Sequence, residues 1–577
     1  MSDKTLIAEG LNTIFQQRAS SIVIGLTGRT GSGCSTVAKE ILSLEKFSEI
    51  SLKDIEIPMR THEDRKKKII KSWLNTHWKP FTIIQVSHVI TSFALESFNG
   101  FRQIVSDVAK DDLFDSQVLI DQGLDFVQIN LSNNFKGILN NIENCEDEEI
   151  AQAYDYYFKK LPIYSEKIKE YLNKAKEGIY TKTYQTLGDT IRTSGLNNLS
   201  QTQAAQLFAL PSRIHQLIKL CSRHNQLIGQ NHNYFAIDAL RHQFEIRYFK
   251  ERIPSFYAMA VTTEEETRRN RLLALGLRVK EIDALDAKEY PIKNKTYQDF
   301  VSQNIQACLE ISDIHISNLS KTNPKDITEL SYQVIKYVAL MQHPGLVTPG
   351  SIERCMQAAV AARMNSGCIS RQVGAVVTDE NYSIKAIGWN DVPKGQVPCL
   401  LRYSRDVIRN NGDVISFSDF ELKNEKFKNQ LKKEDVVNSE LDEIKGRHIT
   451  YCFKSVYSNL TGEKNQVHTR SLHAEENAFL QVSKYGGQAI EGGNLFTSAS
   501  PCELCAKKAY QLGIKNIYFI DPYPGISSSH ILGVGDNRPT LNLFSGAIGR
   551  AFHNLYESIM PYKDEINSLI VTSDRLI

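Results

Sequence analysis

The chain has 577 residues, 41% of them apolar and 23% charged, and a formal net charge of +2. This length exceeds what one hydrophobic core usually serves, so at least two domains are expected, and the near-neutral charge disfavours a surface built for nucleic acid. No stretch reaches about 18 consecutive apolar residues, and the start, MSDKTLIAEG, lacks the apolar core of a signal peptide. We therefore expect a cytoplasmic protein without a membrane span.

The first predicted element is a strand over residues 21–26, followed by a glycine-rich loop and a helix. The loop consists of Gly28, Arg29, Thr30, Gly31, Ser32, Gly33, Cys34, Ser35 and Thr36. In this context backbone N–H groups hold nucleotide phosphates, and Ser35 has the position that faces Mg²⁺. Because Cys34 replaces the lysine of a P-loop, the pattern predicts binding of a Mg²⁺-nucleotide without phosphoryl transfer.

Other parts of the first half resemble small nucleotide kinases. They are the apolar runs at 234–238 and 314–318, Asp238 with Arg241 and Glu245, and an arginine cluster at 267–271, which could also be a solvated helix face. The resemblance implies an α/β domain over residues 1–340, a P-loop nucleotide-kinase-like parallel sheet that binds a regulatory nucleotide. The mostly helical pattern from about 100 to 230 is interpreted as an insertion in that domain.

Glycine and proline breakers between 321 and 350 predict a domain boundary near residue 340. The second domain, residues 341–577, is predicted to begin with a helix over 352–364 and strands over 372–378 and 384–389. Helix, strand, helix and strand follow from 472 to 520. The charged stretch 421–445 is interpreted as a solvated helix or loop without a chemical role.

The strongest chemical pattern is His473-Ala474-Glu475 followed by Pro501-Cys502-Glu503-Leu504-Cys505. It matches the H-x-E and P-C-x-x-C signature of zinc nucleobase deaminases. His473, Cys502 and Cys505 are expected to hold a catalytic Zn²⁺ and leave one position for water, whose pKa the metal lowers. Glu475 is expected to carry protons from the water to the base and the departing amine.

Segments around this signature resemble the deoxycytidylate deaminase family: 368–377, Gly388-Trp389-Asn390-Asp391-Val392-Pro393 and 473–478. The resemblance implies a cytidine-deaminase-like α/β/α sandwich in which Asn390 hydrogen-bonds the sugar or phosphate of a free nucleotide. It places Tyr523 near the nucleotide, although packing under a loop is an equal alternative. Trp389 and Asp391 depart from the tyrosine and glycine of the family, which leaves the shape of the phosphate pocket open.

Several members of that family bind a second, structural zinc. Cys368, Cys399 and His468 occupy the corresponding positions here, and Cys452 could complete the set. The resemblance therefore implies a second, closed tetrahedral Zn²⁺ site. The alternative, a group of unrelated buried residues, remains equally open.

The order of the two halves resembles the bacterial anti-phage dCTP deaminases, in which a P-loop domain without its lysine precedes a deoxycytidylate deaminase-like domain. This resemblance implies deamination of dCTP, and also of dCMP, to the uracil nucleotide, which depletes dCTP during infection. It also implies a homo-oligomer that a small RNA or an antitoxin holds inactive, with no membrane partner.

Three other interpretations remain. A housekeeping dCMP deaminase fused to a nucleotide kinase is opposed by Cys34. A polynucleotide cytosine deaminase is opposed by the near-neutral charge and the lack of basic, aromatic-rich stretches. A nucleotide sensor without catalysis is opposed by Glu475, which a purely structural zinc site does not need.

Overall fold

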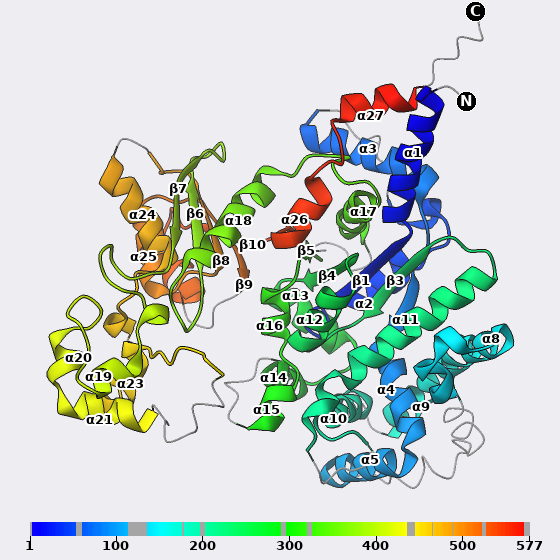
Figure 1. Ribbon diagram of the computed structural model, residues 1–577, viewed down its shortest axis with the longest axis horizontal. Coiled ribbons are helices and arrows are strands. Elements are labelled where there is room, and N and C mark those ends of the chain that lie inside the picture. Colours follow the sequence, from blue (N-terminus) through cyan, green and yellow to red (C-terminus); the bar gives the residue numbers. More distant parts are fainter. Residues whose placement is uncertain are drawn as a thin grey trace, which may run out of the picture. The chain divides into compact units, whose positions relative to one another are not determined.

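The computed structural model describes residues 3–52, 60–112, 135–175, 178–196, 202–289, 296–319, 326–434, 445–463, 466–486, 489–521 and 527–570. Contacts within the chain divide it into two units (Figure 1). The first unit holds the described residues up to 348 and again from 550 onward, and the second holds 349–549.

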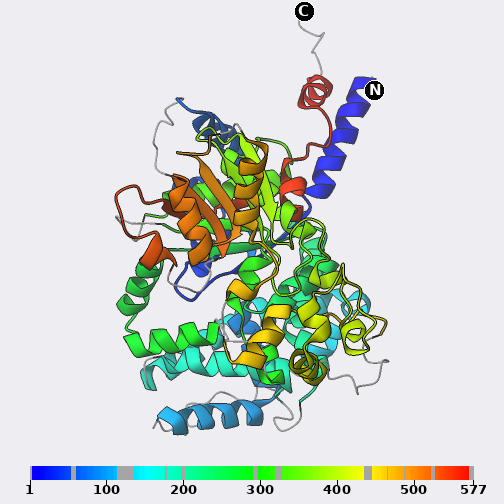
Figure 2. The same cartoon turned by 90° about the vertical axis from the view of Figure 1, so that its left-hand side faces the viewer.

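The division differs from the one expected from sequence, because the last helices belong to the first unit. Helix α27 (Tyr562–Leu569) lies beside α1 (Asp3–Arg18) in both views (Figures 1 and 2). Glu565 of α27 pairs with His343 at 2.8 Å, and both side chains are buried. Proline and glycine residues indicate where the chain passes from one domain to the next. They do not show that a later segment packs back onto the first domain.

The strands of the first unit form a parallel sheet in the order β5-β4-β1-β3-β2. Their bounds are β1 Ser21–Thr27, β2 Thr82–Gln85, β3 Asn233–Asp238, β4 Phe256–Thr262 and β5 Ile314–Ser317. The strands predicted at 21–26, 234–238 and 314–318 are thus β1, β3 and β5. Strands β1 and β4 are apolar and buried along nearly their whole length, as in a sheet covered on both faces.

The predicted helical insertion lies between β2 and β3. It contains α4 (Val86–Glu96), α5 (Phe98–Asp112), α8 (Asp147–Asp155), α9 (Leu161–Ala175), α10 (Ile179–Thr193) and α11 (Ala209–Leu227). These helices share one apolar core that includes Leu172, Leu187 and Leu220. The other helical elements of this unit are α2 (Cys34–Val37), a π-helical turn (Ala38–Leu42), α3 (His62–His77), α12 (Gln243–Arg252), α13 (Glu265–Ala274), α14 (Val279–Glu289), α15 (Tyr297–Val301), α16 (Ile305–Glu310), α17 (Thr328–Gln342) and α26 (Gly549–Tyr556). Every helix in the described ranges is too short or too polar to cross a membrane.

The second unit is an α/β/α sandwich around a mixed sheet in the order β10-β9-β8-β6-β7. Its strands are β6 (Gly374–Thr378), β7 (Ile384–Trp389), β8 (Asn494–Ala499), β9 (Asn516–Asp521) and β10 (Thr540–Leu543). The two-residue strand β11 (Gly546–Ala547) is not part of this sheet. Helix α18 (Ser351–Ala362) covers one face, while α24 (Ala474–Tyr485) and α25 (Glu503–Gln511) cover the other (Figure 1). Successive residues of β8 serve the two faces in turn: Leu495 packs under α24 and α25, and Phe496 under α18.

A helical insertion follows β7 and has a core of its own. It contains α19 (Ser404–Ile408), α20 (Asp419–Lys423), α21 (Glu425–Glu434) and α23 (Phe453–Thr461). The interpretation of 421–445 as a solvated stretch is wrong for its first part: Glu421 is fully buried, and Arg402 Nη1 and the Tyr451 hydroxyl each donate to its Oε1 at 2.7 Å. A count of charges misses this, because a buried partner makes a buried charge tolerable. Residues 435–444 lie outside the described ranges.

Candidate metal centre and glycine-rich loop

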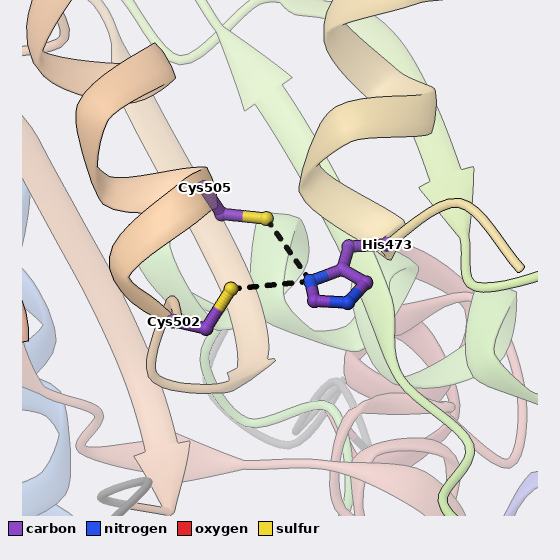
Figure 3. Close-up of side chains that lie close together, drawn as sticks. All are labelled: His473, Cys502 and Cys505. Atoms are coloured by element: carbon purple, nitrogen blue, oxygen red, sulfur yellow. Dashed lines mark hydrogen bonds between the residues drawn. The ribbon is translucent and has the colours of Figure 1, made fainter. Parts of the chain in front are cut away.

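Three metal-ligand side chains meet where two helices of the second unit begin (Figure 3). His473 is the N-cap of α24, Cys502 is the N-cap of α25, and Cys505 lies in the first turn of α25. His473 Nδ1 lies 3.2 Å from Cys502 Sγ and 3.4 Å from Cys505 Sγ. In the described part of the chain, this is the one group of three or more His, Cys or acidic side chains with ligand atoms within 4.8 Å of one another.

The geometry of the three side chains fits a zinc ion. Tetrahedral bonds of about 2.3 Å to sulfur and about 2.0–2.1 Å to nitrogen place the two ligand atoms roughly 3.5 Å apart. The two observed S···N distances are close to this value. Two thiolates and one imidazole suit zinc, and three protein ligands leave a fourth position for a reactant.

The two cysteines share a proton in a way that already favours one thiolate. The Cys505 thiol donates to Cys502 and lowers the pKa of Cys502 to about 3. The same hydrogen bond, together with burial, raises the pKa of Cys505. Helix α25 starts at Glu503, directly after Cys502, and the backbone N–H groups at this helix start further favour a thiolate.

Glu475 lies beside the three ligand side chains but outside their set. It is the second residue of α24 and is only 4% exposed, and burial raises the pKa of its carboxyl group. The hydroxyl of Thr497, on β8, lies 3.2 Å from Glu475 Oε1. Sequence reasoning missed Thr497, although its odd-numbered position on β8 puts it on the face that α24 covers. A buried carboxyl group of this kind suits proton transfer.

In the structure, the side chain of Asn390 is hydrogen-bonded to the protein backbone. Its Oδ1 accepts from the N–H of Val373 at 2.7 Å, and its Nδ2 donates to the carbonyl of Arg371 at 2.7 Å. Asn390 thereby fixes the conformation of residues 371–373. Tyr523, the other residue expected near a nucleotide, lies outside the described residues.

Arg371 is a cation near the metal centre that sequence reasoning missed. Its guanidinium pairs with the fully buried carboxylate of Asp521 at the end of β9, and 29% of the Arg371 side chain remains exposed. Asp521 is paired in the sheet with Ala499, three residues before Cys502. The position of Arg371 directly before the strand predicted over 372–378 was the signal in the sequence that could have identified it.

The residues expected to hold a second zinc are only partly brought together. Burial raises the pKa of Cys399, and the nearby thiols of Cys452 and Cys368 raise it further, although the Arg402 guanidinium next to Cys399 lowers it. The Leu400 N–H donates to the carbonyl of Gly367 at 3.0 Å, which holds the segment of Cys368 beside that of Cys399. His468 packs its ring against Tyr457, with 4.7 Å between centroids.

In the first unit, the glycine-rich loop leads from β1 into α2. Gly31 and Gly33 have φ of 87° and 111°, values that L side chains rarely adopt, and the Asn318 amide donates to the carbonyl of Ser32 at 2.8 Å. The Ser35 hydroxyl donates to Asp238 Oδ2 at 2.8 Å. Cys34 is buried, and burial together with the charge of Asp238 raises its pKa to about 12, so it is a neutral thiol.

Two arginines of α13 reach this loop. Arg268 is 1% exposed and donates to the carbonyl of Thr30 at 3.2 Å. Arg271 Nη1 lies 3.5 Å from the carbonyls of Gly31 and Ser32, and no carboxylate of the described residues pairs with it. Neither residue lies on a purely solvated face.

Comparison with known proteins concerns the second unit. Residues 349–521 match the family described as "Cytidine and deoxycytidylate deaminase zinc-binding region". The deoxycytidylate deaminase of Enterobacteria phage T4 is 26% identical over 168 residues, which cover 29% of this chain and 76% of that protein. ComE operon protein 2 of Bacillus subtilis (strain 168) is 41% identical over 54 residues, 9% of this chain and 28% of that protein.

A crystal structure of the dCMP deaminase from cyanophage S-TIM5, in complex with dCMP and dUMP, is 21% identical and covers 33% of this chain and 95% of its own, with a TM-score of 0.20. The family match defines the class: the second unit carries a zinc-binding domain of the cytidine and deoxycytidylate deaminase type. More particularly, the T4 and T2 phage relatives, each 26% identical, are deoxycytidylate deaminases.

Proposed function

We propose that the protein hydrolyses the amino group of cytosine in free deoxynucleotides, converting dCTP, and also dCMP, to the uracil nucleotide and ammonia. The observation that carries this proposal is the convergence of His473, Cys502 and Cys505 beside the buried Glu475. The resemblance to phage deoxycytidylate deaminases supports the choice of a free deoxynucleotide as substrate.

The roles of the residues follow from their chemistry. Zinc bound by His473, Cys502 and Cys505 would supply a Lewis acid that lowers the pKa of water. Glu475 accepts a proton from the attacking water and passes it to N3 of cytosine. It then carries a second proton to the amino group, which leaves as ammonia. Burial of Glu475 holds its pKa above the usual range, so its carboxylate takes up a proton more readily than an exposed glutamate does.

Recognition of the nucleotide phosphate is assigned to Arg371. Asn390 fixes the backbone on both sides of Gln372, the residue after Arg371, and 29% of the Arg371 side chain is exposed to solvent, where it can contact an anion beside its pair with Asp521. Arg371→Lys keeps the charge against Asp521 but loses the planar fork of donors. It should raise KM for dCMP and dCTP more than KM for deoxycytidine.

For the first unit we propose a regulatory Mg²⁺-nucleotide site at the glycine-rich loop, without kinase activity. Ser35, the residue expected on the magnesium side, donates its hydroxyl to Asp238 Oδ2 at 2.8 Å. Arg271 supports the proposal because it places a cation, paired with no carboxylate in the described ranges, over the carbonyls of a loop that lacks its lysine.

A structural zinc held by Cys368, Cys399 and Cys452, with His468 as fourth ligand, is proposed for the second unit. Metal analysis that finds one zinc per chain would remove it.

The biological role we propose is depletion of dCTP during phage infection, in a cytoplasmic homo-oligomer restrained by a small RNA or an antitoxin. It is supported by the resemblance of the two-domain order to anti-phage dCTP deaminases. In cells that carry the protein, dCTP should fall after infection, and it should not fall with Glu475→Ala. Equal dCTP levels with both proteins would contradict the role.

The enzymatic test uses the purified full chain with dCTP, dCMP, CTP and a cytosine-containing single-stranded DNA, and uracil products are detected by mass spectrometry. Turnover of dCTP or dCMP is expected, with no conversion of the DNA. Conversion of the DNA alone would instead favour a polynucleotide deaminase. A zinc-loaded protein inactive on all four substrates would favour a non-catalytic sensor.

A further inference from the structure

The carboxylate of Glu289, the last residue of α14, contacts the glycine-rich loop. Its side chain is fully buried, 259 residues along the chain from Thr30. Glu289 Oε1 accepts from the Thr30 N–H at 2.9 Å, from the Thr30 hydroxyl at 2.6 Å and from Arg241 Nη1 at 2.9 Å. One carboxylate oxygen thus accepts hydrogen bonds from a backbone N–H, a hydroxyl and a guanidinium.

These three donors are the kind that binds phosphate oxygens. Backbone N–H groups of glycine-rich loops and arginine guanidinium groups recognise phosphate in proteins generally. A carboxylate that satisfies the same donors occupies the place of an anion. Donors already committed to Glu289 are not available to a second anion at the same time.

The other oxygen of this carboxylate is poorly satisfied. Glu289 Oε2 is buried without a hydrogen bond from any described residue, and it lies 3.8 Å from Arg29 Nε. A buried acceptor without a hydrogen bond costs free energy. This cost weakens the hold of Glu289 on the loop, so another anion displaces it more easily.

Two further arginines at the loop, Arg29 and Arg268, are also held by acidic side chains. Arg29 pairs with Asp286 of α14 at 2.6 Å, and Arg268 pairs with Asp286 at 2.7 Å and with Glu265 at 2.8 Å. Helix α14 therefore presents two carboxylates, Asp286 and Glu289, to the cations around the loop. Release of α14 would remove both of these carboxylates from the loop, while Glu265 of α13 would still pair with Arg29 and Arg268.

We propose that Glu289 is a built-in competitor of phosphate at the glycine-rich loop. A nucleoside triphosphate binds by displacing this carboxylate, and α14 moves away from the loop when it does. The inference rests on the proposed nucleotide site and adds its regulation. Because the closed arrangement lowers the apparent affinity by the fraction of open protein, removal of the Glu289 charge should tighten binding.

Binding of ATP, dTTP and inorganic tripolyphosphate, each with Mg²⁺, is measured by calorimetry on the full chain. Glu289→Gln should bind at least one of these probes about tenfold more tightly than the wild type, which corresponds to an open fraction of about a tenth. Asp283→Asn is the matched control, because Asp283 lies on the same helix in a more exposed pair with Arg269 at 2.9 Å. Its affinity should equal that of the wild type.

Hydrogen exchange of the wild type gives a second readout that needs no variant. Binding of tripolyphosphate should speed amide exchange in α14 and slow it in the loop. Equal affinities of Glu289→Gln and wild type, or binding without faster exchange in α14, would contradict the proposal that Glu289 competes with phosphate. The proposed nucleotide site would be unaffected by either result. Failure of both proteins to bind every probe would overturn the site and the competitor together.

Discussion

The hydroxyl of Thr497 lies 3.2 Å from Oε1 of Glu475 and 2.8 Å from the carbonyl of Ala499. Thr497 is fully buried on β8, the strand that leads into the cysteine segment. A single side chain therefore connects the carboxyl group assigned to proton transfer with the strand that precedes Cys502. The position of Glu475 relative to the metal ligands depends on this contact as well as on the two helix starts.

Replacement of Glu475 tests the assignment of proton transfer. Glu475→Gln should lower kcat by a factor of about 10²–10⁴, the usual contribution of a general acid–base group. Zinc content, measured by mass spectrometry of the metal, should stay equal to the wild type because Glu475 is outside the ligand set. Undiminished ammonia release from the variant would show that another group carries the protons.

Thr497→Val should keep the shape of β8 and remove the hydroxyl. We expect kcat to fall about tenfold with little change in KM, the cost of one hydrogen bond that positions Glu475. Thr540→Val, on the exposed start of β10, is the control and should leave kcat unchanged. If the two variants have the same steady-state kinetics, the contact does not position Glu475.

The buried pair of Arg402 and Glu421 predicts a large effect on stability. Both side chains are 0% exposed, so Glu421→Gln would leave a guanidinium without its charged partner. The free energy of unfolding in urea should fall by about 3–5 kcal/mol. Asp419→Asn, which breaks the exposed pair with Lys423, should change it by less than about 1 kcal/mol. Similar losses for both variants would contradict the buried character of the first pair.

His88 predicts a loss of stability in acid. Burial lowers its pKa to about 4 from an ordinary value of 6.5, because the attraction of Glu166 does not make up for lost hydration. A pKa that is lower in the folded protein means that this stability is present above about pH 6.5. It is lost as the pH falls toward 4, because the unfolded chain binds the proton more readily.

The contribution of His88 can be measured by comparing the free energy of unfolding at pH 7.5 with that at pH 5.5. The contribution of His88 should fall by about 1 kcal/mol over this interval. His88→Gln should show a smaller difference in the free energy of unfolding between the two pH values than the wild type. His62→Gln, on the exposed start of α3, should keep the wild-type difference. An equal pH dependence in His88→Gln would place the acid sensitivity elsewhere.

Local spacing was enough to predict which side chains come together as candidate metal ligands. His473 and Glu475 are two residues apart, and Cys502 and Cys505 three apart, so each pair is positioned within one helix start. Strands such as β1 and β3 were also predictable, because continuous apolar runs identify buried strands. In these cases the relevant geometry is set by neighbours along the chain.

Contacts between distant segments were decided only by the tertiary structure. The amide of Asn390 turns to the backbone of 371–373, Glu421 is buried against Arg402, and Glu289 reaches Thr30. In each case a polar group is satisfied by a partner far along the chain, and its burial depends on that partner. The sequence by itself determined which side chains can bind a metal and move a proton. Only the packing of distant segments decided which polar groups remain available to a ligand, because a hydrogen bond made inside the protein removes that group from recognition.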